Sequence, residues 1–413
     1  MSLPIAGAAV TDQPALTIFC HDAPYPPHHG ARVDMSRRIE ALHALGVRLQ
    51  IVAWWCDSGS HVALEHSLRA VADDVLVLDL ARDLPTKIRK SLLLARYPWE
   101  EASRWLPPAQ VAQVVARVEA FAPDAVMLDG LHGARLALAV CDRLLLPLLY
   151  RSHNIEYVYA RRLYATSRGR QRLRRFFTAW RAEPLETRVI EHAARVYDCS
   201  ADDMKFWEAR GYSHFRWHPP IVRVEALVAD GHTPSHDVGF IGNLTMDNNV
   251  DGITWFLSDV LPRLTARHGA VRVLIAGRSP VPALQALCES LPDVTLIADP
   301  DDVRPLYAQA RVFVNPVRQG SGIKVKTLEM LGLGVTFVTT REGASGLPDD
   351  IRDQLPIADD ADTFAAELHA QLSAADAGTA DAVAIPDAFS PQAQSVIIDD
   401  IRELSRPAIP GAT

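Results

Sequence analysis

Short apolar segments rich in β-branched residues alternate with longer helical patterns along this chain, and the alternation starts twice. The first set of predicted strands comprises Leu16–Cys20, Leu49–Trp54, Val75–Leu80, Ala125–Leu128 and Leu146–Arg151. These segments are short and almost continuously apolar, which is typical of strands buried on both faces of a sheet. Helical patterns such as Ser36–Leu45 lie between them, and Gly46 follows as a stop signal. Strand and helix in alternation predict a parallel sheet with right-handed crossovers.

The same rhythm restarts in the second half of the chain. The second set of predicted strands comprises Val238–Ile241, Val271–Ala276, Val294–Ile297, Val312–Asn315 and Val335–Thr339. Between the two sets lies His218–Val222, whose two prolines break regular structure and suit a linker between domains. A chain of 413 residues is long enough for two domains. We therefore predict an α/β protein with two Rossmann-like domains facing each other across a cleft, with ligands beyond the carboxyl ends of the strands.

Composition excludes several classes of protein. Apolar residues make up 48% of the chain and charged residues 22%, so a disordered, fibrous or disulfide-scaffold protein is excluded. The net charge of −8 argues against a broad nucleic-acid surface. No two of the five cysteines stand at C-x-x-C spacing, which indicates free thiols in a reducing compartment. We expect no membrane span, no signal peptide and a cytoplasmic location.

The segment Asn315–Leu331 carries the strongest chemical signal. A predicted strand ends at Asn315, a glycine loop follows, and a helix is predicted to begin near Lys324–Lys326. Free amides at a helix N-terminus, together with cationic side chains, suit a diphosphate. Glu329 lies about one turn into this helix, where a carboxylate can accept hydrogen bonds from ribose hydroxyls. The alternative is an ordinary strand-to-helix loop with a capping acid; a P-loop is excluded because its motif is absent.

Several motifs in fixed order resemble the nucleotide-binding domain of group 1 (family 4) glycosyltransferases. They are Phe240-Ile241-Gly242-Asn243-Leu244, Asn249-Val250-Asp251-Gly252, Ile275-Ala276-Gly277, Asp302–Tyr307, the glycine-lysine segment and Gly343–Leu347. The N-terminal half matches more loosely, through Pro24–Pro27 ahead of Gly30 and through Arg151–Glu156. The resemblance implies a GT-B fold, a nucleoside diphosphate sugar as co-substrate, and transfer that retains the anomeric configuration without a metal ion.

The resemblance also divides the chain by role. Residues 1–14 are predicted to be a flexible tail, and the resemblance implies an acceptor-binding domain over 15–218 and a nucleotide-sugar domain over 219–385. Residues 386–413 are expected to hold a helix that crosses back to the N-terminal domain, followed by a tail.

Two departures from the family pattern concern the donor site. Many members have a Glu eight positions before the helix glutamate, where this chain has Ser321, so only Glu329 carries over. The positions of the usual phosphate-binding Arg and Lys are Asn243 and Asn249, both neutral. A diphosphate leaving group still requires positive charge, and Lys326 is the first replacement because it stands in the first turn of the helix. The predicted donor-binding residues are Gly30, Asn243, Arg318, Gly320, Ser321, Gly322, Lys324, Lys326 and Glu329.

In the N-terminal half, His153 follows a buried strand. The resemblance implies that this histidine approaches the donor sugar, so we predict His153, Lys326 and Glu329 as the catalytic set. His132, a second histidine that follows a predicted strand, is a further candidate for this role. The predicted acceptor-binding residues are Arg32, Asp34, Asn154 and Glu156. We predict no metal site and no cofactor beyond the donor, with UDP or GDP favoured over ADP.

The stretch Tyr157–Ala182 holds eight arginines and no acid, with Phe176, Phe177 and Trp180 interleaved. This composition suits the interface of an anionic membrane or a lipid-diphosphate acceptor. The alternative is a solvated helix paired with acids such as Glu183, Glu186 and Glu191. We predict a peripheral contact with the inner face of a membrane through residues 161–181, and no nucleic-acid partner.

The leading functional hypothesis is a retaining hexosyltransferase that moves a sugar to a hydroxyl of a glycan or lipid-linked acceptor, in polysaccharide or glycoconjugate biosynthesis. A sugar-nucleotide 2-epimerase shares the implied architecture and also grips a diphosphate. A non-catalytic member that binds a nucleotide sugar or a partner protein is the third hypothesis, because both usual phosphate cations are replaced by asparagine. A donor-hydrolysis assay separates the three.

Overall fold

The computed structural model describes residues 13–27, 30–57, 60–80, 88, 91–222, 234–320, 322–376 and 387–405. The chain forms two compact units. The first contains residues up to Cys199, Phe206–Ile221 and the chain from Pro391 onward, and the second contains Ser200–Lys205 and Val222–Ser390. The predicted N-terminal tail falls almost entirely outside the described residues, and the main division, between Ile221 and Val222, lies within the segment His218–Val222.

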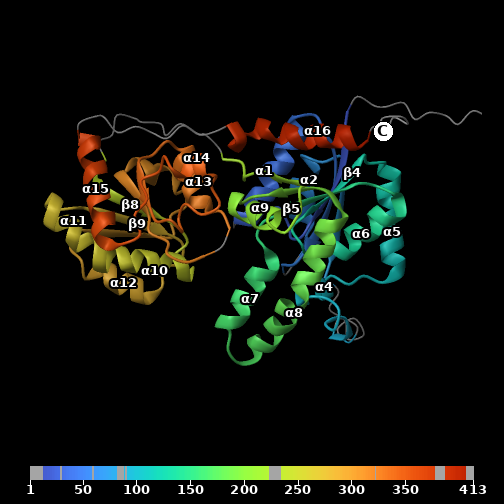
Figure 1. Ribbon diagram of the computed structural model, residues 1–413, viewed down its shortest axis with the longest axis horizontal. Helices are drawn as coiled ribbons and strands as arrows, with labels where there is room; N and C mark the ends of the chain where they lie inside the picture. The colour runs from blue at the N-terminus through green and yellow to red at the C-terminus, as the bar shows by residue number, and fades with distance from the viewer. Residues whose placement is uncertain are drawn as a thin grey trace, which may run out of the picture. The chain divides into compact units, whose positions relative to one another are not determined.

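The first unit is built on a parallel sheet of seven strands in the order β3-β2-β1-β4-β5-β6-β7 (Figure 1). Its strands are β1 (Ala15–Cys20), β2 (Arg48–Trp55), β3 (Asp74–Asp79), β4 (Ala125–Asp129), β5 (Leu148–Ser152), β6 (Ala193–Asp198) and β7 (Phe215–Trp217). The five predicted strands of this half all overlap observed ones. We missed β6 and β7. The strand β6 directly follows a long helix without any turn residue, and β7 is only three residues long.

Helices connect and cover these strands. They are α1 (Gly30–Ala44), α2 (Val62–Arg69), α4 (Trp99–Ser103), α5 (Pro108–Phe121), α6 (Ala134–Leu144), α7 (Glu156–Thr166), α8 (Gly169–His192) and α16 (Ser395–Leu404). Helix α9 (Ala201–Glu208) belongs to the second unit as far as Lys205 and to the first unit from Phe206. Helix α1 begins six residues before the predicted start at Ser36, at Gly30. The prediction was late because the first turns of α1 carry charged side chains, Arg32 and Asp34, that are buried rather than exposed.

The C-terminal helix α16 belongs to the first unit, as the predicted crossover required. Ile397 and Ile401 lie fully buried in a core cluster with Leu16, Ile18 and Leu49 of the sheet. Asp400, on the same helix, accepts a hydrogen bond from Tyr197 Oη at 2.8 Å and ion-pairs with Arg195 and Arg216. Apolar burial and one buried carboxylate therefore fasten the end of the chain to the first unit.

The second unit is a parallel sheet of five strands in the order β10-β9-β8-β11-β12. Its strands are β8 (His236–Ile241), β9 (Val273–Gly277), β10 (Val294–Ala298), β11 (Ala310–Asn315) and β12 (Phe337–Thr339), each overlapping a prediction. The elements that join them are α10 (Asp247–Trp255), the π-helix η1 (Phe256–Val260), α11 (Leu261–His268), α12 (Pro282–Glu289), the 3₁₀-helix η2 (Arg304–Ala308), α13 (Val325–Gly332), α14 (Asp349–Arg352) and α15 (Ala361–Asp376). The short 3₁₀-helices η3 (Asp387–Phe389) and η4 (Pro391–Gln394) precede α16.

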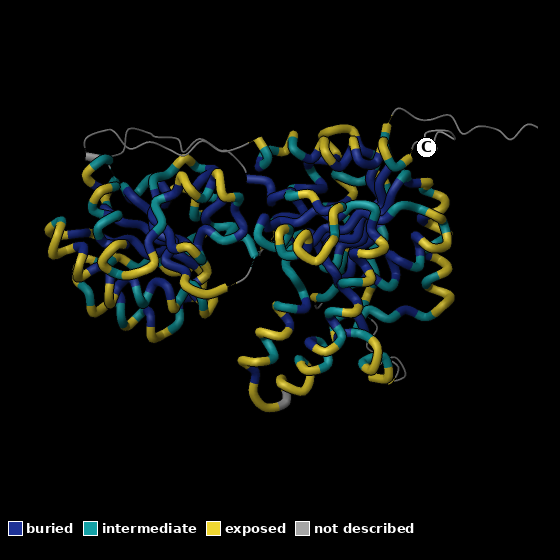
Figure 2. The backbone as a smooth tube through the Cα atoms, in the orientation of Figure 1, coloured by how far each residue is buried: buried dark blue, intermediate teal, exposed yellow. Residues whose placement is uncertain are grey.

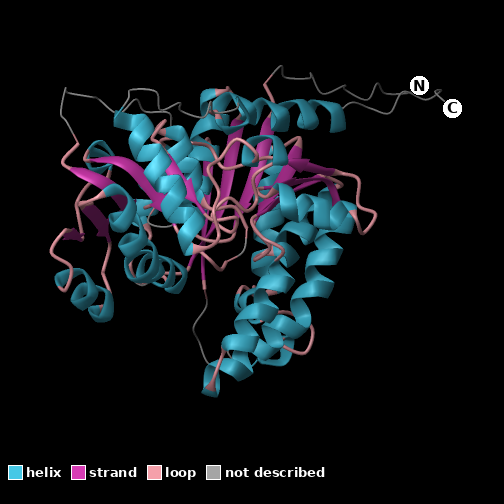
Figure 3. Cartoon of the chain, turned by 60° about the vertical axis from the view of Figure 1, so that its left-hand side comes forward, coloured by secondary structure: helices cyan, strands magenta, loops and turns pink. Residues whose placement is uncertain are grey.

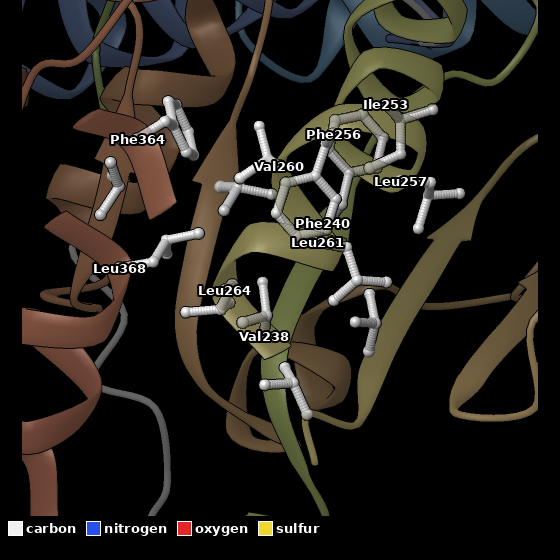
Figure 4. Packing of buried hydrophobic residues seen from close by; sticks show 14 of the residues in the cluster. Val238, Phe240, Ile253, Phe256, Leu257, Val260, Leu261, Leu264, Phe364 and Leu368 are labelled. Atoms are coloured by element: carbon white, nitrogen blue, oxygen red, sulfur yellow. The ribbon is translucent and has the colours of Figure 1, made fainter. Parts of the chain in front are cut away.

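A core of aromatic and aliphatic side chains holds the helices of the second unit to its sheet (Figure 4). Phe256 and Leu264 from η1 and α11 pack with Phe364 from α15 and with Phe240 from β8, and all four are fully buried. Figure 2 shows the same division in each unit, with buried strands inside and exposed residues on the outer turns of the helices. Two parallel sheets of Rossmann-like type confirm the predicted fold class. Within the described ranges, no helix combines the length and the apolar character needed to cross a membrane.

The packing of α16 on the first unit can be tested by truncating the buried side chain of Ile401. Ile401 is 1% exposed, so we expect Ile401→Ala to destabilise the first unit by about 2–4 kcal/mol, because the cavity left behind cannot be filled. Differential scanning calorimetry measures this loss as a lower unfolding temperature of the first unit. Val396→Ala is the matched control, since Val396 is 37% exposed on the same helix. Equal shifts in both variants would show that α16 does not depend on this burial.

Candidate active site

In each unit, functional candidates collect where the strand order reverses. The first sheet reverses between β1 and β4, and the second between β8 and β11. In open parallel sheets, ligands bind beyond the carboxyl ends of the strands at such points. In the first unit, His21 follows β1, Asp129 ends β4 and His153 follows β5. In the second, Gly242 follows β8 and the glycine loop follows β11.

His153 is hydrogen-bonded to a buried carboxylate. Its Nε2 lies 2.7 Å from Asp129 Oδ1, and its Nδ1 lies 3.7 Å from Asp34 Oδ2. Burial disfavours the imidazolium, but the hydrogen bond to Asp129, the contact with the sulfur of Cys199 and the charge of Asp129 outweigh it and raise the pKa of His153 to about 10. At neutral pH His153 therefore carries a proton on both ring nitrogens and a positive charge.

Beneath this pair lies a network of buried charges. Arg38 Nη2 lies 2.6 Å from Asp34 Oδ2 and 3.0 Å from Asp129 Oδ2, and Arg151 Nη2 lies 3.2 Å from Asp34. Arg151 also donates to the carbonyl of His218. Burial opposes ionisation, but the Arg38 charge lowers the pKa of Asp129 to about 2, and Arg151 and Arg38 lower that of Asp34. Because each charge has a partner, this network fixes the carboxylate that holds His153.

Two other histidines at this edge are neutral. His21 Nδ1 lies 2.7 Å from the carbonyl oxygen of Asp129, and its ring contacts that of His153 edge-on at 5.5 Å. Burial and then the charge of His153 lower the pKa of His21 to about 4. Burial likewise lowers the pKa of His132, whose ring lies 6.3 Å from that of His21. One charged imidazole thus stands among neutral ones, a polar surface that can hydrogen-bond hydroxyl groups.

His21, Asp129 and His153 offer ligand atoms within 4.8 Å of one another, as do Asp34, His153 and Cys199. Both sets are already engaged, because Asp129 holds His153 Nε2 and Arg38, and Asp34 holds two guanidinium groups. A cation placed here would have to displace or repel buried arginines. We therefore assign both sets to the hydrogen-bond network.

The predicted acceptor residues lie near this network but differ in what they offer. Arg32 is buried and ion-paired with Asp22 at 2.8 Å and with Asp57 at 3.0 Å. Asp34, 5% exposed, is bonded to two arginines, so it is a positioning residue for the network. Asn154 is half-buried in the turn between β5 and α7, and Glu156, also half-buried, is the first residue of α7. Gly30, the donor-binding candidate of this half, is exposed at the start of α1.

A pocket of about 240 Å³ lies elsewhere in the first unit, lined by Tyr97, Leu106, Leu136, Leu185 and Arg188 among others. It contains none of the predicted site residues. We place the candidate site at the strand ends because the polar and charged side chains converge there, whereas cavity size alone carries no chemistry.

In the second unit, Lys324 binds the glycine loop to the segment that carries Glu342 and Ser345. Its Nζ lies 2.9 Å from the carbonyl oxygen of Gly322, 3.1 Å from Ser345 Oγ and 2.9 Å from Glu342 Oε1. Gly322 adopts a left-handed backbone with φ of 63°, which favours glycine. The charge of Lys324 is therefore committed to the loop, and its side chain is 10% exposed.

Lys326 instead points inward from the first turn of α13. Its Nζ lies 3.1 Å from Asn249 Oδ1 and 3.8 Å from the centre of the Phe240 ring. A side chain at Gly242 would meet this Nζ at 2.8 Å, so the glycine leaves the space that Lys326 occupies. Burial lowers the pKa of Lys326 to about 7, and the charge of Glu329 offsets part of that effect.

Asn249, the neutral residue at a usual cation position, is thus bonded to an ammonium that comes from another element. Asn249 Nδ2 also donates to the carbonyl of Asn243 at 2.8 Å, and the Asn243 side chain caps the turn at Thr245. Glu329, one turn after Lys326, is half-buried; with burial, its charge raises the pKa of Tyr307. The structure brings Asn243, Asn249, Lys326 and Glu329 into one neighbourhood.

The remaining donor candidates lie on the loop itself. Arg318 is exposed, with its guanidinium 5.0 Å from the centre of the Trp255 ring. Gly320 is exposed, and a side chain there would meet Lys324 Nζ at 3.0 Å. Ser321 lies outside the described residues.

Sequence reasoning missed Asp129, Arg38 and His21. Asp129 and His21 stand at the carboxyl ends of two strands that we predicted correctly, and this position was the available signal. Arg38 follows Asp34 by four residues on a helix that we began too late, so the buried pair went unnoticed.

Comparison with known proteins adds the family. Residues 235–374 match the model of the family described as glycosyl transferases group 1. The second unit is a group 1 glycosyltransferase domain. The resemblance of the group 1 motifs in this half is therefore confirmed.

The whole chain is similar to further proteins. It is 23% identical over 375 residues to an uncharacterized 44.6 kDa protein in the cps region of Klebsiella pneumoniae, covering 84% of this chain and 88% of that protein. Anabaena HepE in complex with UDP superposes with a TM-score of 0.58 at 13% identity, covering 95% of this chain and 100% of HepE. A glycosyltransferase from Rickettsia africae gives a TM-score of 0.62 at 10% identity, covering 96% and 100% of the two chains. These likenesses confirm the GT-B fold around the group 1 domain.

The state of His153 yields a prediction. Removing the charge of its partner with Asp129→Asn should lower the pKa of His153 from about 10 toward the ordinary value of about 6.5. NMR titration of the imidazole measures this shift. Tyr197→Phe, which removes a buried hydrogen bond to Asp400 in the same unit, is the control and should leave the pKa unchanged. An unshifted value in Asp129→Asn would contradict the assigned role of Asp129.

Proposed function

We propose that this chain is a retaining glycosyltransferase that moves a sugar from a nucleoside diphosphate sugar to a hydroxyl acceptor. The observation that carries the proposal is the partly buried ammonium of Lys326 beside Asn249 and Glu329, at the reversal point of a group 1 glycosyltransferase domain. An anionic leaving group needs a cation there, because charge builds up on the diphosphate as the glycosidic bond breaks. Lys326 supplies that charge, although the positions of the usual cations hold Asn243 and Asn249.

In the proposed reaction each residue has a separate task. Glu329 accepts hydrogen bonds from the ribose, and Lys326 neutralises the diphosphate, with Arg318 and the amides of Gly320–Gly322 around it. His153, charged at neutral pH, hydrogen-bonds the hexose. The bond between the anomeric carbon and the phosphate oxygen breaks, and the acceptor oxygen bonds the same carbon on the same face. The leaving phosphate takes the acceptor proton, so no protein base and no metal ion is required.

UDP is the first donor nucleotide to test, since the structural relative HepE has been observed with UDP and with UDP-glucose. We place the acceptor, a glycan or a lipid-linked glycan, on the first unit and assign the reaction to polysaccharide or glycoconjugate biosynthesis. We also propose a cytoplasmic protein in peripheral contact with the inner face of an anionic membrane.

A donor panel of UDP-, GDP- and ADP-sugars tests the function. A transferase should release nucleoside diphosphate and free sugar slowly without acceptor, and NMR should show the original anomer first. Release of nucleotide together with a sugar altered at carbon 2 would favour the epimerase. Tight binding without any release would favour the non-catalytic alternative.

The lowered pKa of Lys326 leads us to expect that nucleotide binding depends on pH. Its pKa of about 7 in the free protein must rise when a diphosphate binds, so binding takes up a proton above neutral pH. The affinity for UDP should therefore fall as pH rises from 7 to 9, by up to about tenfold per pH unit. Isothermal titration calorimetry in buffers of different ionisation enthalpy measures both effects.

The variant Lys326→Met should bind UDP more weakly at pH 7 and lose the pH dependence. Lys205→Met is the matched control, because Lys205 is half exposed and ion-paired with Asp349. Wild-type affinity that stays constant between pH 7 and pH 9 would refute the role of Lys326.

The ribose contact of Glu329 is tested by a double-mutant cycle. Removing one hydrogen bond to a charged group should weaken UDP binding about tenfold in Glu329→Gln. Wild type should lose a similar factor with UDP analogues that lack a ribose hydroxyl, whereas the variant should lose little more. Additive losses would show that Glu329 does not contact the ribose.

A further inference from the structure

Helices α7 and α8 form an antiparallel hairpin that extends away from the sheet of the first unit (Figures 1 and 3). Arg161 and Glu183 are ion-paired across the hairpin, and Arg175 donates to the carbonyl of Leu163. Buried Glu186 accepts hydrogen bonds from the first amides of α7, at 2.9 Å each, and forms no ion pair with any arginine whose side chain the structure describes. These contacts hold α7 and α8 together, so the side chains on the outer face of the hairpin keep their positions relative to one another.

An apolar ridge runs along the outer face of α8. Leu173, Phe176 and Trp180 are 65%, 42% and 49% exposed, and their spacing of three and four residues places them on one face of the helix. The rings of Phe176 and Trp180 stack with their centres 6.1 Å apart. A contiguous exposed group of large apolar side chains marks a surface that meets a less polar partner.

Arginines line both sides of this ridge. Helical geometry places Arg172 on one side and Arg181 on the other, each about 80–100° from Leu173. Arg181 lies 3.5 Å from the centre of the Trp180 ring, and Arg172 lies 5.0 Å from that of Tyr164. Neither arginine, nor Arg168, forms an ion pair with any residue that the structure describes, so their charges remain available for an anionic partner.

The apolar ridge favours an anionic bilayer over an RNA as the partner of these arginines. An RNA would be bound by arginines and by flat rings on which bases stack, and an exposed leucine between them would contribute nothing. At the surface of a bilayer, by contrast, aromatic and aliphatic side chains enter the interfacial layer while flanking arginines contact lipid phosphates. The net charge of −8 shows that the arginines are a local concentration and not a property of the whole chain.

We propose that the outer face of α8, with the ridge Leu173–Phe176–Trp180 in the interfacial layer and Arg172 and Arg181 on lipid phosphates, is the surface that binds an anionic bilayer. This inference rests on the peripheral contact proposed above and names its surface. It does not depend on the donor site, so the two proposals can fail separately.

Cosedimentation with sucrose-loaded vesicles tests the proposal. The full chain should bind vesicles of phosphatidylglycerol and phosphatidylcholine, bind pure phosphatidylcholine at least tenfold more weakly, and lose affinity as salt is raised. The variant Arg172→Glu/Arg181→Glu should bind the anionic vesicles at least about tenfold more weakly, since it replaces two attractive charges near the surface with two repulsive ones. Arg267→Glu/Arg341→Glu is the control with the same charge change on the second unit, and it should bind as wild type.

The ridge itself is tested without changing charge. Phe176→Ser/Trp180→Ser should weaken binding, whereas Val62→Ser, at a 68% exposed position on α2, should not. Brominated lipids should quench tryptophan fluorescence in wild type, and Trp180→Phe should remove most of that quenching. UDP binding measures folding and the donor site in every variant and should stay unchanged.

Equal binding to anionic and neutral vesicles would overturn the proposal, as would wild-type binding by the two α8 variants. Preferential binding of a single-stranded RNA that displaces the vesicles would assign the surface to nucleic acid instead.

Discussion

Parallel strand pairing is the constraint on which the rest of this structure depends. A parallel strand must be followed by a crossover, so every loop that leaves a carboxyl end emerges at the same edge of its sheet. Where the strand order reverses, neighbouring crossovers diverge and leave room between them. In the first unit this edge holds Asp129 and His153, and in the second it holds Gly242 and Lys326. The chemistry of the protein is therefore concentrated at two positions set by topology.

Charge is handled differently at the two positions. In the first unit, Arg38 keeps the buried carboxyl of Asp129 ionised, and the hydrogen bond to Asp129, together with Cys199, keeps His153 protonated well above neutral pH. In the second unit, Lys326 is partly buried against an aromatic ring and an amide, and its pKa falls to about 7. A site that holds its cation partly discharged favours an anionic ligand that restores the charge. The proposed donor diphosphate is such a ligand.

Lys326 also resolves the departure from the family pattern. Two neutral asparagines stand at the positions of the usual cations, yet one of them, Asn249, accepts a hydrogen bond from the lysine of α13. Gly242 makes this possible because any side chain there would collide with the ammonium. In the proposed function, the cation therefore comes from α13, and it lies at the ends of the strands of the second unit.

Apolar periodicity and glycine placement are local properties, so the two α/β sheets, most of their strands and the glycine-lysine loop could be predicted from the amino-acid order. The position of Lys326 also placed it ahead of Lys324 as the candidate cation. The commitment of Lys324 to its own loop, and the control of His153 by Asp129 and Arg38, became visible only in the folded chain. Asp129 lies 24 residues from His153 and 91 residues from Arg38 along the chain, and the three side chains meet only when parallel strands align their ends. A pKa depends on burial and on charges within a few ångströms, and neither is written in the local sequence.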